Sequence, residues 1–183
     1  MRAKCSVFIA TSLDGYIARE DGAIDWLAAA NALVPTGETC GFAEFMSTVD
    51  TLVMGRNSFE QALSFGEWPY GETPLVVLSR TLQCLPQQVP PTVTLAAEAP
   101  AALVARLSAV GRRHLYVDGG LTIQSFLAVD LIDEITITAI PVILGSGRPL
   151  FGPVQGDVRL RHLSTRAYEF GFVQTRYQVC HEA

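Results

Sequence analysis

The chain of 183 residues carries 13 Lys+Arg against 18 Asp+Glu, a net charge of −5, and 49% of its residues are hydrophobic while 17% are charged. This composition predicts one compact domain over residues 1–183 with a core of buried strand. Because its few cations are not clustered, we exclude a nucleic-acid-binding or anionic membrane surface. The four scattered cysteines and three histidines show no ligand spacing, so we expect no metal site and reduced thiols.

The first two-thirds of the chain alternates between strands and helices. Apolar runs predict buried strands at residues 7–10, 51–54, 74–78 and 93–95. Apolar positions at helical spacing predict an amphipathic helix over residues 39–49, and a second helix begins near Pro100 with Leu103, Leu107 and Val110 as its apolar stripe. Residues 11–27, with two Asp-Gly pairs, predict a long loop after the first strand.

A strand, a glycine turn and a helix follow one another over residues 115–127. The turn is Asp118-Gly119-Gly120, which differs from the GxGxxG fingerprint of Rossmann folds. Paired glycines let backbone N–H groups approach a ligand, and the N-terminus of a helix favours an anion. The segment therefore predicts either a pyrophosphate site or a tight turn without a ligand.

The last third of the chain reads as antiparallel strands. Residues 158–166 and 172–180 predict a terminal hairpin, and the alternation of Val173, Thr175, Tyr177 and Val179 indicates an edge strand. Together the segments predict an α/β fold with a mostly parallel central sheet, antiparallel C-terminal strands and flanking helices. The sequence shows no signal-peptide pattern and no apolar run of about 18–20 residues, so we expect a soluble, cytoplasmic protein.

Three strand ends carry residues suited to phosphate: residues 55–58 (GRNS), 78–80 (LSR) and 118–120 (DGG). Ligands of open α/β sheets bind outside the carboxyl ends of the strands, so we expect these three junctions to form one site. Two arginines and two serines among them favour a dinucleotide with an extra ribose phosphate.

These motifs, in this order, resemble the dihydrofolate reductase superfamily. The segments that carry the resemblance are SLDGYIA at 12–18, DWL at 25–27, MGR at 54–56, LSR at 78–80 and DGG at 118–120. With IPVILG at 140–145 and PLF at 149–151, the chain is most similar to stand-alone relatives of the reductase domain of the bifunctional riboflavin-biosynthesis deaminase/reductase. The resemblance implies a single-domain dihydrofolate reductase-like fold with an eight-stranded sheet. It also implies that the protein uses NADPH.

The resemblance also implies roles for individual residues. The nicotinamide carboxamide would meet the backbones of Ala10 and Ile17. The pyrophosphate and adenosine phosphate would be held by Gly55, Arg56 and Ser58. The adenine and 2′-phosphate end would contact Leu78, Ser79 and Arg80. The pyrophosphate would also be cradled by Gly119, Gly120, Leu121 and Thr122, and Asp14-Gly15 would lie over the nicotinamide.

The chain departs from folate reductases in its first helix, where they place a carboxylate that faces the pterin. The matching position here is near Thr39, so folate reduction is not expected, and no catalytic residue is identified. Glu38 reads either as a proton relay or as a solvated glutamate at a helix start. Trp26 and Phe42 read either as substrate contacts or as core aromatics.

We therefore expect an NADPH-dependent oxidoreductase that passes a hydride to a small heterocycle, pterin- or pyrimidine-like, or to a carbonyl compound. The alternative is a regulatory module that binds NADPH without turnover, which the missing helix carboxylate favours. A homodimer is compatible with the resemblance, because family relatives often pair.

Overall fold

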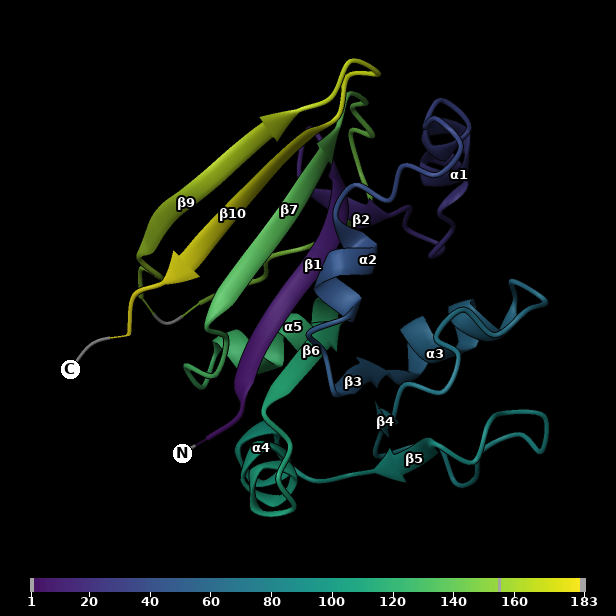
Figure 1. Cartoon of the computed structure of the whole chain (residues 1–183), viewed down its shortest axis with the longest axis vertical. Helices are drawn as coiled ribbons and strands as arrows, with labels where there is room; N and C mark the ends of the chain where they lie inside the picture. The colour runs from purple at the N-terminus through teal and green to yellow at the C-terminus, as the bar shows by residue number, and fades with distance from the viewer. Residues whose placement is uncertain (1, 155, 182–183) are drawn as a thin grey trace.

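The computed structural model describes residues 2–154 and 156–181 (Figure 1). One eight-stranded sheet forms its centre, in the order β5-β4-β3-β6-β1-β7-β10-β9. Its strands are β1 (Lys4–Ser12), β3 (Thr51–Gly55), β4 (Leu75–Leu78), β5 (Val93–Ala96), β6 (His114–Asp118), β7 (Glu134–Ile140), β9 (Leu160–Ala167) and β10 (Val173–Val179). Two short strands, β2 (Tyr16–Ala18) and β8 (Arg148–Pro149), pair separately.

The six strands from β5 to β7 are mutually parallel, and β10 is antiparallel to both β7 and β9. This arrangement confirms the predicted parallel sheet with antiparallel C-terminal strands. The parallel strands read as continuous apolar runs because both of their faces are covered; four of the five residues of β3 are buried.

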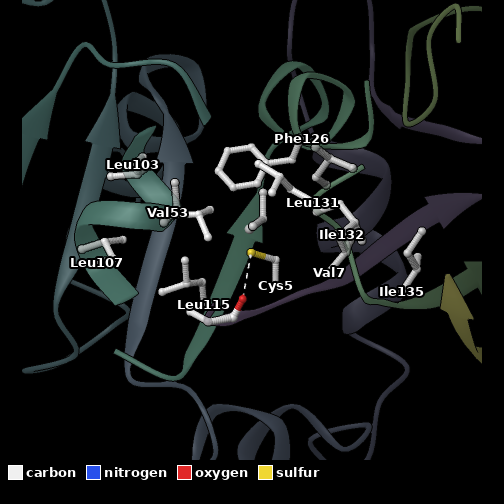
Figure 2. Packing of buried hydrophobic residues seen from close by; sticks show 14 of the residues in the cluster. Cys5, Val7, Val53, Leu103, Leu107, Leu115, Phe126, Leu131, Ile132 and Ile135 are labelled. Carbon is white, nitrogen blue, oxygen red and sulfur yellow. Dashed lines mark hydrogen bonds between the residues drawn. The ribbon is translucent and has the colours of Figure 1, made fainter. Parts of the chain in front are cut away.

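Helices cover the two faces of the parallel part of the sheet. The helices are α1 (Asp25–Asn31), α2 (Phe42–Met46), α3 (Arg56–Leu63), α4 (Pro100–Ala109) and α5 (Gly120–Leu127). On one face, α4 and α5 bury Leu103, Leu107 and Phe126 against Val53 and Leu115 of the strands (Figure 2). On the other face, α3 contributes Phe59 to a cluster with Leu52 and Met54, against which the aromatic residues of α2 pack. Each fully buried phenylalanine contributes roughly 1.5–3 kcal/mol.

The helix predicted over residues 39–49 is shorter than expected. It spans Phe42–Met46, because Cys40 and Gly41 adopt positive φ angles of 50° and 78°, which an α-helix does not contain. The apolar pattern nevertheless predicted the core-facing side of this segment, since Phe42, Phe45 and Met46 face the core.

Three further expectations are corrected. The stripe of α4 stops at Leu107, because Val110 lies beyond the helix end and is 69% exposed. The predicted edge strand, β10, is internal, and β9 forms the edge instead. The loop after the first strand contains two regular elements, β2 and α1, that its turn residues concealed. No helix in the described ranges is long and apolar enough to cross a bilayer.

Candidate functional site

Two helices begin side by side at the carboxyl edge of the sheet. Helix α3 starts after Gly55 of β3, and α5 starts after Gly119, which follows the neighbouring strand β6. Within the described part of the chain, no side chain caps either helix, so their first N–H groups point outward without a side-chain acceptor. Two adjacent helix N-termini with free donors suit an anionic group.

Glycine is required where these helices begin. Gly119 has a φ of +88°, and a Cβ there would overlap the hydroxyl of Ser58 on α3. A Cβ on Gly55 would lie 2.8 Å from Thr122 Oγ1 on α5. The two turns thus interlock, each glycine accommodating a hydroxyl of the opposite helix. Gly55, Ser58, Gly119, Gly120 and Thr122, which we call the glycine cradle, are among the predicted cofactor residues.

The remaining phosphate candidates lie next to the cradle. Strand β4 pairs with β3, and Leu78 is in register with Gly55. The Ser79 hydroxyl accepts hydrogen bonds from the N–H groups of Thr81 and Leu82, at 3.2 and 3.0 Å, and so shapes the turn after β4. Arg56 donates to Thr81 Oγ1 at 3.2 Å.

Both predicted arginines are accessible to a ligand. The Arg56 side chain is 46% exposed and forms a loose pair with Glu60 at 3.6 Å, and Arg80 is exposed at the turn. Leu121, at the start of α5, is 73% exposed, so its side chain is not part of the core. The structure therefore brings the three predicted junctions to neighbouring strands at one edge.

Ala10 and Ile17 lie on the other side of the cradle. Ala10 is in β1, the strand beside β6, and a Cβ on Gly120 would come within 2.8 Å of Ile17 Cδ1. The preceding loop is pinned, because Asp14 accepts hydrogen bonds from the N–H groups of Leu144 and Gly145 at 3.1 and 2.8 Å. Hydrogen bonding lowers the pKa of the Asp14 carboxyl.

A cleft of about 580 Å³ opens beside the end of β1. This volume lies within the range of small-molecule sites, roughly 300–1,000 Å³. Its apolar wall includes Phe8 and Ala10 of β1, Leu27 of α1, Val34 of the following connection and Phe42 of α2. Ala10 therefore belongs both to the cleft and to the strand next to the cradle.

The structure separates the two predicted substrate aromatics. Phe42 lines the cleft, with its ring 5.5 Å from that of Phe8. Trp26 is 5% exposed and packs in a core cluster with Ile140, Tyr168 and Phe172. Within the described residues its indole Nε1 has no hydrogen-bond partner.

Asp118 connects the cradle with the cleft. It directly precedes Gly119, and its carboxylate accepts a hydrogen bond of 3.3 Å from the Tyr116 hydroxyl. The single hydrogen of this hydroxyl is shared with a closer acceptor, the backbone oxygen of Phe8, a cleft residue, at 2.8 Å. Burial raises the pKa of the half-buried Asp118 carboxyl and that of the Tyr116 phenol. Asp118 is therefore a carboxyl next to the cradle that stays protonated to higher pH than an ordinary aspartic acid.

Glu38 lies in the cleft wall rather than at a helix start. Its carboxylate accepts a 2.6 Å hydrogen bond from the backbone N–H of Cys40 and lies 3.4 Å from Arg166 on β9. Burial, followed by the nearby Glu38 charge, raises the pKa of the Cys40 thiol.

Sequence reasoning missed a polar pair on the last strands. Gln174 on β10 donates from Nε2 to the backbone oxygen of Cys40 at 2.8 Å and to Thr138 Oγ1 on β7 at 3.0 Å, and Thr138 lines the cleft. The available signal was the pair Thr136 and Thr138, polar residues at buried positions of β7. The described residues contain no group of three or more His, Cys, Asp or Glu side chains placed to hold a metal ion.

Comparison with known proteins identifies the family to which the chain belongs. The family model described as "RibD C-terminal domain" matches residues 3–173. The chain belongs to the RibD C-terminal domain family. It is 35% identical over 170 residues to the "Uncharacterized protein YwjB" of Bacillus subtilis (strain 168), covering 92% of this chain and 94% of that protein.

Two solved structures are similar to this one. The "Putative riboflavin biosynthesis protein" of Shewanella sp. PV-4 has a TM-score of 0.91 and 42% identity, covering 97% of this chain and 99% of that chain. The deaminase/5-amino-6-(5-phosphoribosylamino)uracil reductase of Thermotoga maritima has a TM-score of 0.71 and 16% identity, covering 98% of this chain and 57% of that chain. The latter likeness concerns the fold, which is that of the dihydrofolate reductase-like RibD reductase domains.

Proposed function

We propose that this protein is an NADPH-dependent reductase that transfers a hydride to a small heterocyclic, pterin- or pyrimidine-like, or carbonyl substrate. The observation that carries the proposal is the glycine cradle, where two uncapped helix N-termini meet next to a cleft of small-molecule size. Membership of the RibD C-terminal domain family supports a reductase activity.

The residues at the carboxyl edge fit a phosphorylated dinucleotide. The space that side chains on Gly55 and Gly119 would fill lets a pyrophosphate approach the N–H groups of both helices. Arg56 directly follows Gly55, and Arg80 follows β4, the strand next to β3, so their guanidinium groups would meet a 2′-phosphate on that side of the cradle. When bound, NADPH supplies the hydride. Ala10, which also lines the cleft, and Ile17 would then hold the nicotinamide carboxamide through their backbones.

Reduction also requires a proton, and we assign it to Asp118. Its raised pKa keeps the carboxyl protonated to higher pH than an ordinary aspartic acid. The Tyr116 hydroxyl, which contacts both Asp118 and the backbone of Phe8, links this carboxyl to the cleft wall. Phe42, which lines the cleft, packs edge-on against the Tyr116 ring at a centroid distance of 6.3 Å, so the Tyr116–Asp118 pair lies next to the cleft.

Titration of protein fluorescence with NADPH and with NADH tests the proposal. The wild type is compared with an Arg56→Ala/Arg80→Ala variant and with a control variant, Arg112→Ala/Arg113→Ala, which alters the opposite end of β6. We expect NADPH to bind more tightly than NADH, and the first variant to lose about 1.5–3 kcal/mol of that preference, as for charge-assisted contacts. The control should retain it.

Turnover is measured by NADPH absorbance with a panel of pterins, pyrimidines and carbonyl compounds. Oxidation with any panel member supports a reductase. Tight NADPH binding without oxidation across the panel would favour a regulatory module, and absence of binding to either nucleotide would refute the proposal.

A further inference from the structure

The charge of the cleft wall restricts the substrate. Among the described residues that line the cleft there is no lysine, arginine or histidine. The ionisable side chains that line it are Glu38 and Cys40, and the raised pKa of Cys40 keeps that thiol neutral at pH 7. The one full charge in the wall is therefore negative.

The nearest guanidinium to Glu38 does not reverse this charge. Arg166 lies 3.4 Å from the Glu38 carboxylate, and its Cζ is 4.4 Å from the centre of the Tyr168 ring. Its side chain is 62% exposed, and Arg166 does not line the cleft, so solvent screens its charge. Glu38 is better enclosed, at 26% exposed, and a hydrogen bond from the Cys40 N–H fixes it.

Thr138 of the cleft wall is neutral, and Gln174 of β10, which does not itself line the cleft, holds it in place. Both N–H bonds of the Gln174 amide are used, towards Cys40 and Thr138, so the amide cannot turn to meet a ligand. Thr138 is 5% exposed, and because its oxygen accepts from Gln174, its hydroxyl hydrogen can donate into the cleft. This hydroxyl suits a carbonyl oxygen or a ring nitrogen.

We propose that the substrate is an uncharged, unphosphorylated compound with a largely apolar body and one hydrogen-bonding edge. This inference rests on the proposed function and names the substrate class of the same site. The apolar body lies against Phe8, Leu27 and Phe42, and the polar edge meets Thr138. The reductase of Thermotoga maritima is named for a phosphoribosyl compound; the wall described here does not provide the cation that such a group requires.

The physical reason is the cost of desolvating a phosphate. A buried anion is stable where a cation or several N–H donors replace its water, and an isolated one is strongly unfavourable. In this cleft a phosphate would instead face the Glu38 carboxylate. A neutral molecule avoids both penalties and gains from contact with the apolar wall.

The test uses two pairs of compounds that differ by one phosphate: 5-amino-6-ribosylaminouracil and its 5′-phosphate, and 4-(hydroxymethyl)benzaldehyde and 4-formylbenzyl phosphate. Dissociation constants for the full chain are measured by calorimetry with saturating NADP⁺ and without it. The same measurements are made on Glu38→Gln, on Arg166→Gln and on a control, Glu72→Gln, which alters an exposed glutamate before β4.

We expect the neutral member of each pair to bind at least ten times more tightly. The ratio of the dissociation constants of the phosphorylated and the neutral member should fall several-fold in Glu38→Gln, rise in Arg166→Gln and stay unchanged in Glu72→Gln. Equal or tighter binding of the phosphorylated members would overturn the inference. Failure of all four probes to bind would also overturn it, because a cleft of this composition should retain the neutral aldehyde at millimolar concentration.

The NADPH titration separates this inference from the proposed function. A protein that binds and oxidises NADPH but prefers the phosphorylated probes loses the substrate inference alone. A protein that binds the neutral probes but neither nucleotide loses the proposed function alone.

Discussion

Replacement of Gly119 by alanine tests the interlocked geometry of the cradle. Gly119 has φ +88° and ψ 134°, a conformation that an L-residue adopts at a cost of about 1–3 kcal/mol. The new methyl group would also overlap the Ser58 hydroxyl, and overpacking of this kind costs about 1–3 kcal/mol. We therefore expect Gly119→Ala to lower the free energy of unfolding by at least about 2 kcal/mol, and to weaken NADPH binding at least tenfold.

The two contributions can be separated by changing Ser58. In a Ser58→Ala background the overlap with the hydroxyl disappears and the backbone strain remains, so the loss caused by Gly119→Ala should shrink by about 1–3 kcal/mol without vanishing. Urea unfolding of the four proteins, with NADPH titration of each, completes the cycle. A Gly119→Ala protein as stable as the wild type, or an identical loss in both backgrounds, would refute this reasoning.

Two further predictions concern the residues around the cleft. Because burial raises the pKa of Asp118, its charged form destabilises the folded protein: the penalty is absent below the unfolded value near 3.8 and grows as pH rises through the folded value. Asp118→Asn should thus gain stability at pH 7 relative to pH 3.5 in urea titrations, while kcat falls; a pH-independent effect would contradict the assigned burial. Phe42→Leu should raise KM several-fold because Phe42 lines the cleft, whereas Trp26→Phe, a core change, should lower the melting temperature and leave KM within twofold. Equal KM shifts in both variants would contradict the separation of these two aromatics.

The sequence determined most of the sheet, because its parallel strands are buried on both faces and appear as unbroken apolar runs. Residues 51–54 and 74–78 were predicted as strands, and they correspond to β3 and β4. The start of α4 followed from Pro100, which occupies the first turn. The terminal hairpin followed from period-two alternation, although the pattern could not show which of its strands is internal.

The sequence failed where non-local contacts override local pattern. The apolar spacing of residues 39–49 predicted one helix, but the positive φ of Cys40 and Gly41 delays its start until Phe42. Helix α1 begins at Asp25 within a segment whose turn residues predicted a loop, and Trp26 anchors it in a core that later residues complete. The predicted homodimer and the roles of the twelve cofactor residues stay predictions.

The candidate site, like the fold, was predictable from the sequence only in part. Each glycine junction was visible in the sequence, because a glycine after an apolar run has a local signature. Their meeting was decided by the strand order, which places β3 beside β6 and β6 beside β1. The assembly of the cleft was beyond sequence reasoning, since Glu38, Thr138 and Phe172, which line it, come from distant segments and carry no shared pattern. The charge of the cleft wall depends on which side chains lie together, and only the tertiary structure decides that.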